Sequence, residues 1–199
     1  MNIRIKRAVM AAGMAATMAL PMAGQASDGT ITFTGAVTAS TCTLSVNGAA
    51  NAGTATVALP TVDTAALTNT VPRTTAAGTF FSIEVSGCTT AADIGGAAPT
   101  QVGIYFEAGP NVDEKTGGLI NTVVGSNVEV NLYNASGASI VGTQIMPGTS
   151  QNQPASQSIP TGAEQFTQWF YAGYSTAGAA AAASAGAVST SITYSLVYQ

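Results

Sequence analysis

Few side chains in this sequence have the chemistry of a catalyst. The chain has no histidine among its 199 residues and only five lysines and arginines. Acid–base and nucleophilic catalysis usually draws on such groups, which leaves a glycosidase with two carboxylates as the enzyme to consider. Isolated carboxylates are mostly solvated surface groups, so we expect no catalytic site. The scattered candidates are Glu84, Glu107, Asp113, Glu114 and Glu129.

The glycine-rich and acidic stretches have no pattern for a metal ion or a cofactor. Asp113, Glu114 and Lys115, followed by Gly117 and Gly118, predict a turn, because the repeated oxygen ligands of a calcium loop are missing. No stretch has the form G-x-x-x-x-G-K-[ST] of a phosphate loop. We therefore expect neither a metal nor a cofactor.

The cysteines Cys42 and Cys88 allow a single intramolecular pairing. A disulfide persists in the oxidising compartment that an exported chain meets, and it is the expected state here. A metal or redox pair is the weaker interpretation, because histidine is missing and the spacing is far from C-x-x-C.

The first 26 residues are expected to be a signal peptide. Arg4, Lys6 and Arg7 precede an apolar run, 8–20, that is too short to span a bilayer as a helix. Small residues follow, which favours cleavage before Ser27, with retention as a membrane anchor as the alternative. The mature chain would keep two basic residues against nine carboxylates, a formal charge of −7. We therefore expect no nucleic acid partner and, after cleavage, no membrane insertion.

The elements that must position these residues are predicted to be strands. Alternating apolar and polar residues recur between Gly, Pro and Asn, and no long stretch has the period of an amphipathic helix. The alanine-rich tract 177–187 is short and is expected to be a loop. About eight short strands favour an all-β sandwich of the immunoglobulin type. The predicted strands are 31–38, 42–46, 55–59, 80–86, 102–107, 128–133, 166–174 and 188–198.

The segment after the predicted cleavage site alternates strictly. Ile31, Phe33, Gly35 and Val37 share one face, while threonine and alanine occupy the other. An ordinary first strand packed on the core is one interpretation. Gly35 favours another, because a glycine inside a strand often marks a place where something else approaches closely.

The last predicted strand has a similar pattern. One face of the strand carries Val188, Thr190, Ile192, Tyr194, Leu196 and Tyr198. Further motifs are the penultimate Tyr198, Gly186 fourteen positions from the C-terminus, F-x-G-x-V at 33–37 ahead of Cys42, Cys88 after Ser86-Gly87, and F-x-A-x-Y at 170–174. In these motifs the chain resembles the type 1 fimbrial subunit family of chaperone–usher pilins.

The resemblance implies an incomplete immunoglobulin-like domain, residues 41–199, that is completed by a donor strand from another subunit. The donor extension would be residues 27–40, with Ile31, Phe33, Gly35 and Val37 in the neighbour's groove. The implied groove-lining and chaperone-contacting residues are Gly186, Val188, Ile192, Tyr194, Leu196, Tyr198 and Gln199.

The implied partners are other copies of the chain, other pilins, a periplasmic chaperone and an outer-membrane usher. The implied function is that of a structural subunit of a fimbria shaft, exported through the periplasm to the cell surface and used in adhesion and biofilm formation.

Two alternatives stay open. Trp169 could stack on a sugar in a secreted, self-contained carbohydrate-binding sandwich. A lone tryptophan beside Phe170 in an apolar strand is, however, more often a core residue. A minor adaptor subunit of the same fimbria fits the same motifs.

Overall fold

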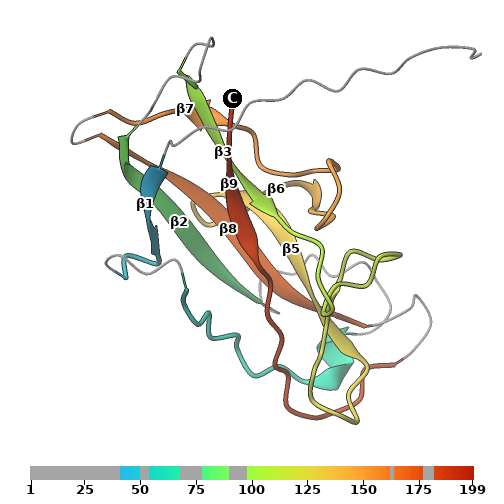
Figure 1. The fold of residues 1–199 in the computed structure, drawn as a ribbon. Helices are drawn as coiled ribbons and strands as arrows, with labels where there is room; N and C mark the ends of the chain where they lie inside the picture. The colour runs from blue at the N-terminus through green and yellow to red at the C-terminus, as the bar shows by residue number, and fades with distance from the viewer. Residues whose placement is uncertain (1–40, 50–53, 68–77, 90–97, 162–163, 177–181) are drawn as a thin grey trace, which may run out of the picture. The chain divides into compact units, whose positions relative to one another are not determined.

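The computed structural model describes residues 41–49, 54–67, 78–89, 98–161, 164–176 and 182–199 (Figure 1). All of them belong to one compact unit, Ala36–Gln199. The predicted signal peptide and donor extension, with Ile31, Phe33, Gly35 and Val37, lie outside the described residues. No helix among the described residues is long and apolar enough to cross a membrane.

The described chain is almost entirely β, which confirms the predicted fold class. One short 3-10 helix, η1 (Thr64–Leu67), follows the first strand. The strands are β1 (Thr41–Val46), β2 (Gly78–Thr89), β3 (Gln101–Phe106), β4 (Leu119–Ile120), β5 (Val128–Ser136), β6 (Ser139–Gln144), β7 (Gln157–Ser158), β8 (Gln165–Thr176) and β9 (Tyr194–Tyr198).

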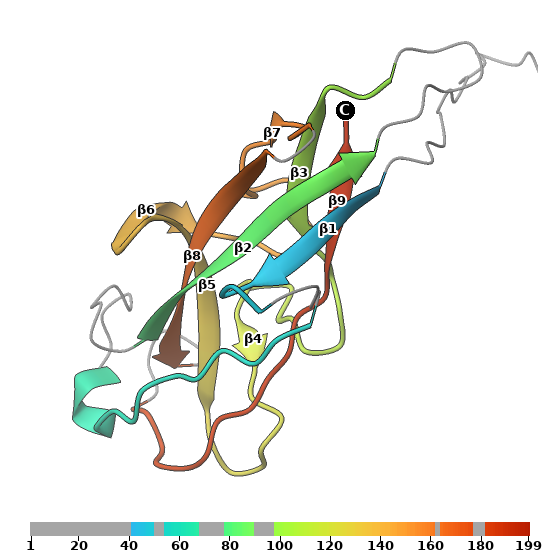
Figure 2. The ribbon, with the colours of Figure 1, turned by 90° about the vertical axis from the view of Figure 1, so that its left-hand side faces the viewer.

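The strands form two antiparallel sheets that pack as a sandwich (Figure 2). The larger sheet has the order β1-β2-β8-β5-β4, with β6 added to β5, and the smaller has the order β7-β3-β9. In β2, Phe81, Ile83 and Val85 are buried while the residues between them are partly exposed. This period of two places one face of the strand in the core.

Aromatic side chains join the two sheets in the core. Phe170 of β8 stacks on Phe81 of β2, with ring centroids 5.3 Å apart, and Phe106 of β3 meets Phe170 edge-on at 5.1 Å. A second, smaller buried cluster lies on the outer face of the larger sheet. It contains Tyr133, Ala135 and Tyr171, with Phe80 and Ile140 packed against them.

Two predicted strands are wrong in part or in full. Residues 55–59 are not a strand, and of 188–198 only Tyr194–Tyr198 is one. The alternation that predicted them is real, since Val57, Leu59, Val188 and Ile192 all pack on the core. A ladder also needs a neighbouring strand, and neither segment has one in the described part of the chain.

The prediction that Trp169 is a core residue is also wrong. Trp169 is 38% exposed, whereas the adjacent Phe170 is fully buried. Because successive strand residues point to opposite faces, the inward position of Phe170 places Trp169 on the outer face of the larger sheet.

Candidate functional site: an open groove between two unpaired segments

A groove of about 930 Å³ lies between two extended segments of the described structure. We call it the open groove. Its first wall is residues 54–59 and its second wall is residues 188–193, which run into β9 (Figure 1, Figure 2). The floor is apolar and consists of Val46, Phe81, Ile83, Phe106, Leu119, Val130, Leu132 and Ala172.

The second wall presents one edge of its backbone to the open groove. In an extended chain the N–H and C=O groups of one residue point to one edge, and those of the next residue point to the opposite edge. The carbonyls of Ser189 and Thr193 accept hydrogen bonds from the N–H groups of Thr122 (2.8 Å) and Glu107 (2.9 Å), on the side away from the groove. The backbone groups of the residues between them, Thr190 and Ile192, therefore point to the groove.

Side-chain hydrogen bonds add to these two backbone bonds and hold the second wall in place without a regular β-ladder. The Asn121 amide donates to the Ala187 carbonyl (3.0 Å) and accepts from the Ser189 N–H (2.9 Å). The Thr122 hydroxyl also donates to the Ser189 carbonyl (2.8 Å), and Asn111 Nδ2 donates to Ser191 Oγ (3.0 Å). The wall is thus fixed from outside while its groove edge stays open.

The first wall separates from the larger sheet at a tight turn. Asn47 and Gly48 have positive φ values of 51° and 73°, which glycine and asparagine tolerate better than other residues. Asn47 is anchored to β2, because its Oδ1 accepts the Ser82 N–H (2.9 Å) and its own N–H donates to the Ser82 carbonyl. Downstream, the Thr79 hydroxyl donates to the Ala58 carbonyl (2.8 Å). The turn thus ends the pairing of β1 with β2, and one side-chain hydrogen bond ties the first wall back to β2 at Ala58.

The predicted C-terminal residues fall into two groups. Val188, Ile192 and Tyr194 line the open groove, whereas Leu196 and Tyr198 follow in β9, half-buried against the core. Gly186 lines a smaller pocket of about 470 Å³ instead. That pocket shares Tyr174 and Val188 with the open groove, so the two are continuous along the wall.

The last two residues are held within the subunit. The Gln199 carbonyl oxygen accepts the N–H groups of Thr100 (2.7 Å) and Gln101 (2.9 Å). Burial raises the pKa of the Tyr198 hydroxyl, and a hydrogen bond with the Cys42 backbone opposes that rise. The side chain therefore reaches from β9 across the sandwich to β1, which closes the end of the fold beyond the groove.

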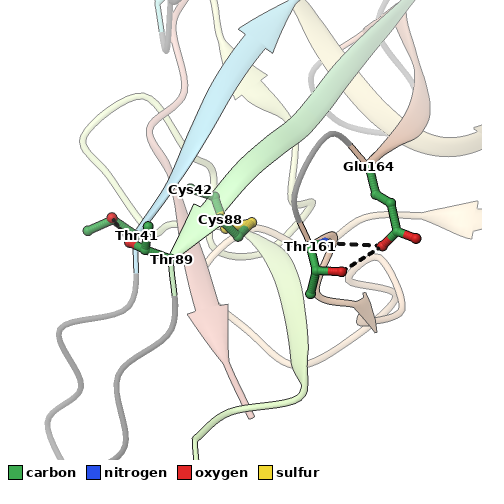
Figure 3. The surroundings of a disulfide bond; sticks show 6 residues. All are labelled: Thr41, Cys42, Cys88, Thr89, Thr161 and Glu164. Carbon is green, nitrogen blue, oxygen red and sulfur yellow. Dashed lines mark hydrogen bonds between the residues drawn. A yellow bond between two sulfur atoms is a disulfide. The ribbon is translucent and has the colours of Figure 1, made fainter.

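The predicted disulfide is present. Cys42 and Cys88 join β1 to β2, beside a hydrogen bond between the hydroxyls of Thr41 and Thr89 (2.9 Å; Figure 3). The bridge closes a loop with a sequence separation of 46. It ties down the start of β1, the strand that leads into the first wall.

The candidate carboxylates do not behave alike. Glu129 is buried at 4% exposure, so the expectation that it is a solvated surface group is wrong. Asp113 Oδ1 accepts the N–H groups of Lys115 (2.8 Å) and Thr116 (3.3 Å), which confirms the predicted turn. Among the described residues, no group of three or more His, Cys, Asp or Glu is arranged to hold a metal ion.

The first wall and the groove floor were not predicted as parts of the site. The sequence feature that marks the first wall is the alternation of Ala55, Val57 and Leu59, and this alternation by itself predicts an ordinary strand. The floor residues lie far apart in sequence and meet only when the sheets pack.

Fold and groove together define an immunoglobulin-like sandwich that lacks one strand and leaves an apolar groove in its place. The profile of the family described as "Type-1 fimbrial protein, A" matches residues 59–199. The chain belongs to this family.

Similar proteins agree with this assignment. The "Major fimbrial subunit SMF-1" of Stenotrophomonas maltophilia (strain K279a) is 33% identical over 90% of this chain and 98% of that protein. The "F17 fimbrial protein" of Escherichia coli is 32% identical over 87% of this chain and 89% of that protein. A subunit from a solved chaperone–usher pilus has the same fold, with a TM-score of 0.52 at 19% identity over 90% of this chain and all of that one.

The chain is therefore a structural subunit of a cell-surface fimbria, and it polymerises with other pilin subunits. Its family is one of structural subunits and not of enzymes. The alternative of a self-contained carbohydrate-binding sandwich is set aside, because that fold would have all of its strands.

Proposed function

We propose that the open groove accepts the N-terminal segment of a second copy of the chain, residues 27–40. Ile31, Phe33 and Val37 would fill the groove, and Gly35 would pass where room for a side chain is lacking. Each subunit would thus complete its neighbour, which is β-strand addition between copies.

The groove edge of the second wall is the observation that carries the proposal. Backbone N–H and C=O groups are obligatory hydrogen-bonding partners, and an open edge is a template for another strand. At Thr190 and Ile192 these groups point to the groove, above an apolar floor. A strand with one apolar and one polar face matches both features, and 31–38 alternates in this way.

The energy available explains a durable joint. Burial of three large apolar side chains contributes roughly 1.5–3 kcal/mol each. Each backbone hydrogen bond adds a net contribution of about 0.5–1.5 kcal/mol. Unzipping would expose strand and groove at once, so dissociation would be slow.

The same groove needs a temporary occupant before assembly, and we assign this role to a strand of a periplasmic chaperone. Exchange for the next subunit would take place at an outer-membrane usher, after export of the chain through the periplasm. The carbonyl oxygen of Gln199 already accepts two N–H groups within the subunit. A basic chaperone residue would therefore bind the other carboxylate oxygen.

We further propose that the chain is a shaft subunit without enzymatic activity, used in adhesion and biofilm formation. The relative from Stenotrophomonas maltophilia is named a major subunit, which supports a shaft role over that of a minor adaptor. The share of this chain in purified fibres separates the two: an adaptor would be present in few copies per fibre.

The test is a deletion of residues 27–38 with co-expressed chaperone and usher. The truncated subunit should still be held by the chaperone but should not assemble into fibres, because it has nothing to offer its neighbour. A matched control is Thr34→Ser, on the polar face of the same segment, which should assemble normally. Normal fibres from the truncated chain would overturn the proposal.

A further inference from the structure

Glu129 is a buried carboxylate that the groove itself does not use. It lies on the outer face of β5 at 4% exposure, and its Oε2 accepts the Thr116 hydroxyl (3.2 Å). Burial raises the pKa of Glu129, the Thr116 hydrogen bond opposes the rise, and the nearby charge of Asp113 adds to it. Lys115 is the basic side chain of the described part of the chain; it is exposed, and its charge does not pair with Glu129.

A second acceptor oxygen lies beside Glu129 and receives no hydrogen bond. Asn131, two residues along the same face of β5, is 5% exposed, and its Oδ1 has no hydrogen-bond partner. Both oxygens lie next to Gly118: a Cβ at this glycine would clash with Glu129 Oε2 and would lie 3.0 Å from Asn131 Oδ1. An unpaired buried acceptor destabilises the fold, and a proton on Glu129 would supply the missing donor.

The loop that covers Glu129 also holds the second wall of the open groove. We call residues 111–122 the cover loop. The middle of the cover loop lies on Glu129, because the Thr116 hydroxyl donates a hydrogen bond to the Glu129 carboxylate. The same hydroxyl oxygen accepts a hydrogen bond from the Gly118 N–H (3.1 Å). Its two ends hold the second wall through Asn111, Asn121 and Thr122.

We propose that protonation of Glu129 stabilises the cover loop in its place over β5 and, through the loop, the wall of the open groove, so that a bound donor strand is held more firmly at acidic pH than at neutral pH. A proton from a hydronium ion adds to Glu129 Oε2 and leaves water behind, and the new O–H donates to Asn131 Oδ1 within β5. The cover loop is favoured over this pair because it then buries neither a charge nor an unpaired oxygen. The coupling to the donor strand rests on the proposed function.

The sign follows from the surroundings of Glu129. Asp113 of the cover loop is the charged group that acts on Glu129, while Glu114 and Lys115 of the same loop are exposed and Tyr133 lies four residues further along β5. The neighbouring Ser175 of β8, Ile120 of β4 and Gln144 of β6 are uncharged. A carboxyl pKa that is raised by folding stabilises the fold fully below the ordinary value of about 4.3, and the gain is lost as pH rises through the raised value. Each pKa unit by which the Glu129 pKa is raised corresponds to about a tenfold change in the equilibrium between the closed and the open cover loop.

The test compares fibres of the mature chain with fibres of Glu129→Gln, whose amide donates a hydrogen bond at every pH. Glu84→Gln is the matched control, because Glu84 lies on the outer face of the same sheet and is paired with Ser45 and Thr167. Amide exchange at Gly117 and Gly118 and the rate of fibre dissociation in denaturant are measured at about pH 4.3 and about pH 7.5.

The parent and the Glu84→Gln fibres should show slower exchange at both glycines and slower dissociation at the acidic pH, after correction for intrinsic exchange. Glu129→Gln should be slow in both readouts at both pH values. The inference is overturned if amide exchange at Gly117 and Gly118 in the parent does not depend on pH. It is also overturned if that exchange depends on pH but the rate of fibre dissociation does not. Faster exchange in Glu129→Gln at neutral pH also overturns it, because the Asn131 amide would then be donating to the carboxylate. Failure of the proposed function would give a different result: the amides of residues 31–37 would not be protected from hydrogen exchange in the parent fibre.

Discussion

Loss of the disulfide should destabilise the subunit by an amount that its loop length sets. Cys42 and Cys88 are separated by 46 residues in sequence, and the chain-entropy relation assigns such a loop about 4 kcal/mol. The bridge also fixes the start of β1, an edge strand of the larger sheet that leads into the first wall. The double replacement Cys42→Ser and Cys88→Ser should therefore cost about 4 kcal/mol in the free energy of unfolding.

Urea unfolding followed by circular dichroism measures this change. Both proteins carry a saturating peptide of residues 30–38, so that the groove is equally filled. With a slope of about 1–3 kcal/mol per molar urea, the midpoint should fall by about 1.3–4 M. Thr41→Val is the control; it removes the neighbouring hydroxyl pair, keeps the bridge and should cost no more than about 1.5 kcal/mol. A double variant whose free energy of unfolding stays within about 1 kcal/mol of the parent would refute the reasoning.

Three further changes test separate parts of the account. Gly35→Leu should block fibre assembly, scored by electron microscopy, more than it weakens binding of the chaperone; equal loss of both would place Gly35 in an intramolecular strand. Asn121→Ala removes the two hydrogen bonds that hold Ala187 and Ser189. It should speed release of a 30–38 peptide by about five- to a hundredfold and leave the near-ultraviolet circular dichroism of the subunit unchanged. Trp169→Ser should destabilise the fold by less than Phe170→Ala, which should cost about 3–5 kcal/mol in thermal or urea unfolding, because Phe170 is fully buried and Trp169 is 38% exposed; similar losses would contradict the assignment of faces.

Local patterns predicted the parts of the fold that local forces determine. The alternation in β2 and β8 reports which side of each strand faces the core, so both strands were predicted to within a few residues. The pairing of Cys42 with Cys88 followed from counting thiols in an exported chain. The strands β4, β6 and β7 were missed. β4 and β7 have two residues each and carry no period, and β6 is largely exposed without a regular alternation of buried and exposed residues.

The candidate site was harder to predict because its defining property is a missing neighbour. Residues 55–59 and 188–193 have the alternation of strands, and sequence does not show whether a partner strand exists on either side. The burial of Glu129 is likewise non-local, since the cover loop that buries it follows a different strand. The donor residues Ile31, Phe33, Gly35 and Val37 stay a prediction.

Amide hydrogen exchange along the second wall tests the central claim most directly. Thr190 and Ile192 point their N–H groups to the groove, while the neighbouring Ser189 N–H is bonded to Asn121 and is an internal control. Assembly of mature subunits into fibres should slow exchange at Thr190 and Ile192 by orders of magnitude and leave Ser189 little changed, and fibres should protect alternate amides of residues 31–37 as well. Exchange at Thr190 and Ile192 that stays as fast in fibres as in the groove-empty subunit would contradict the claim that a strand from another copy fills the groove.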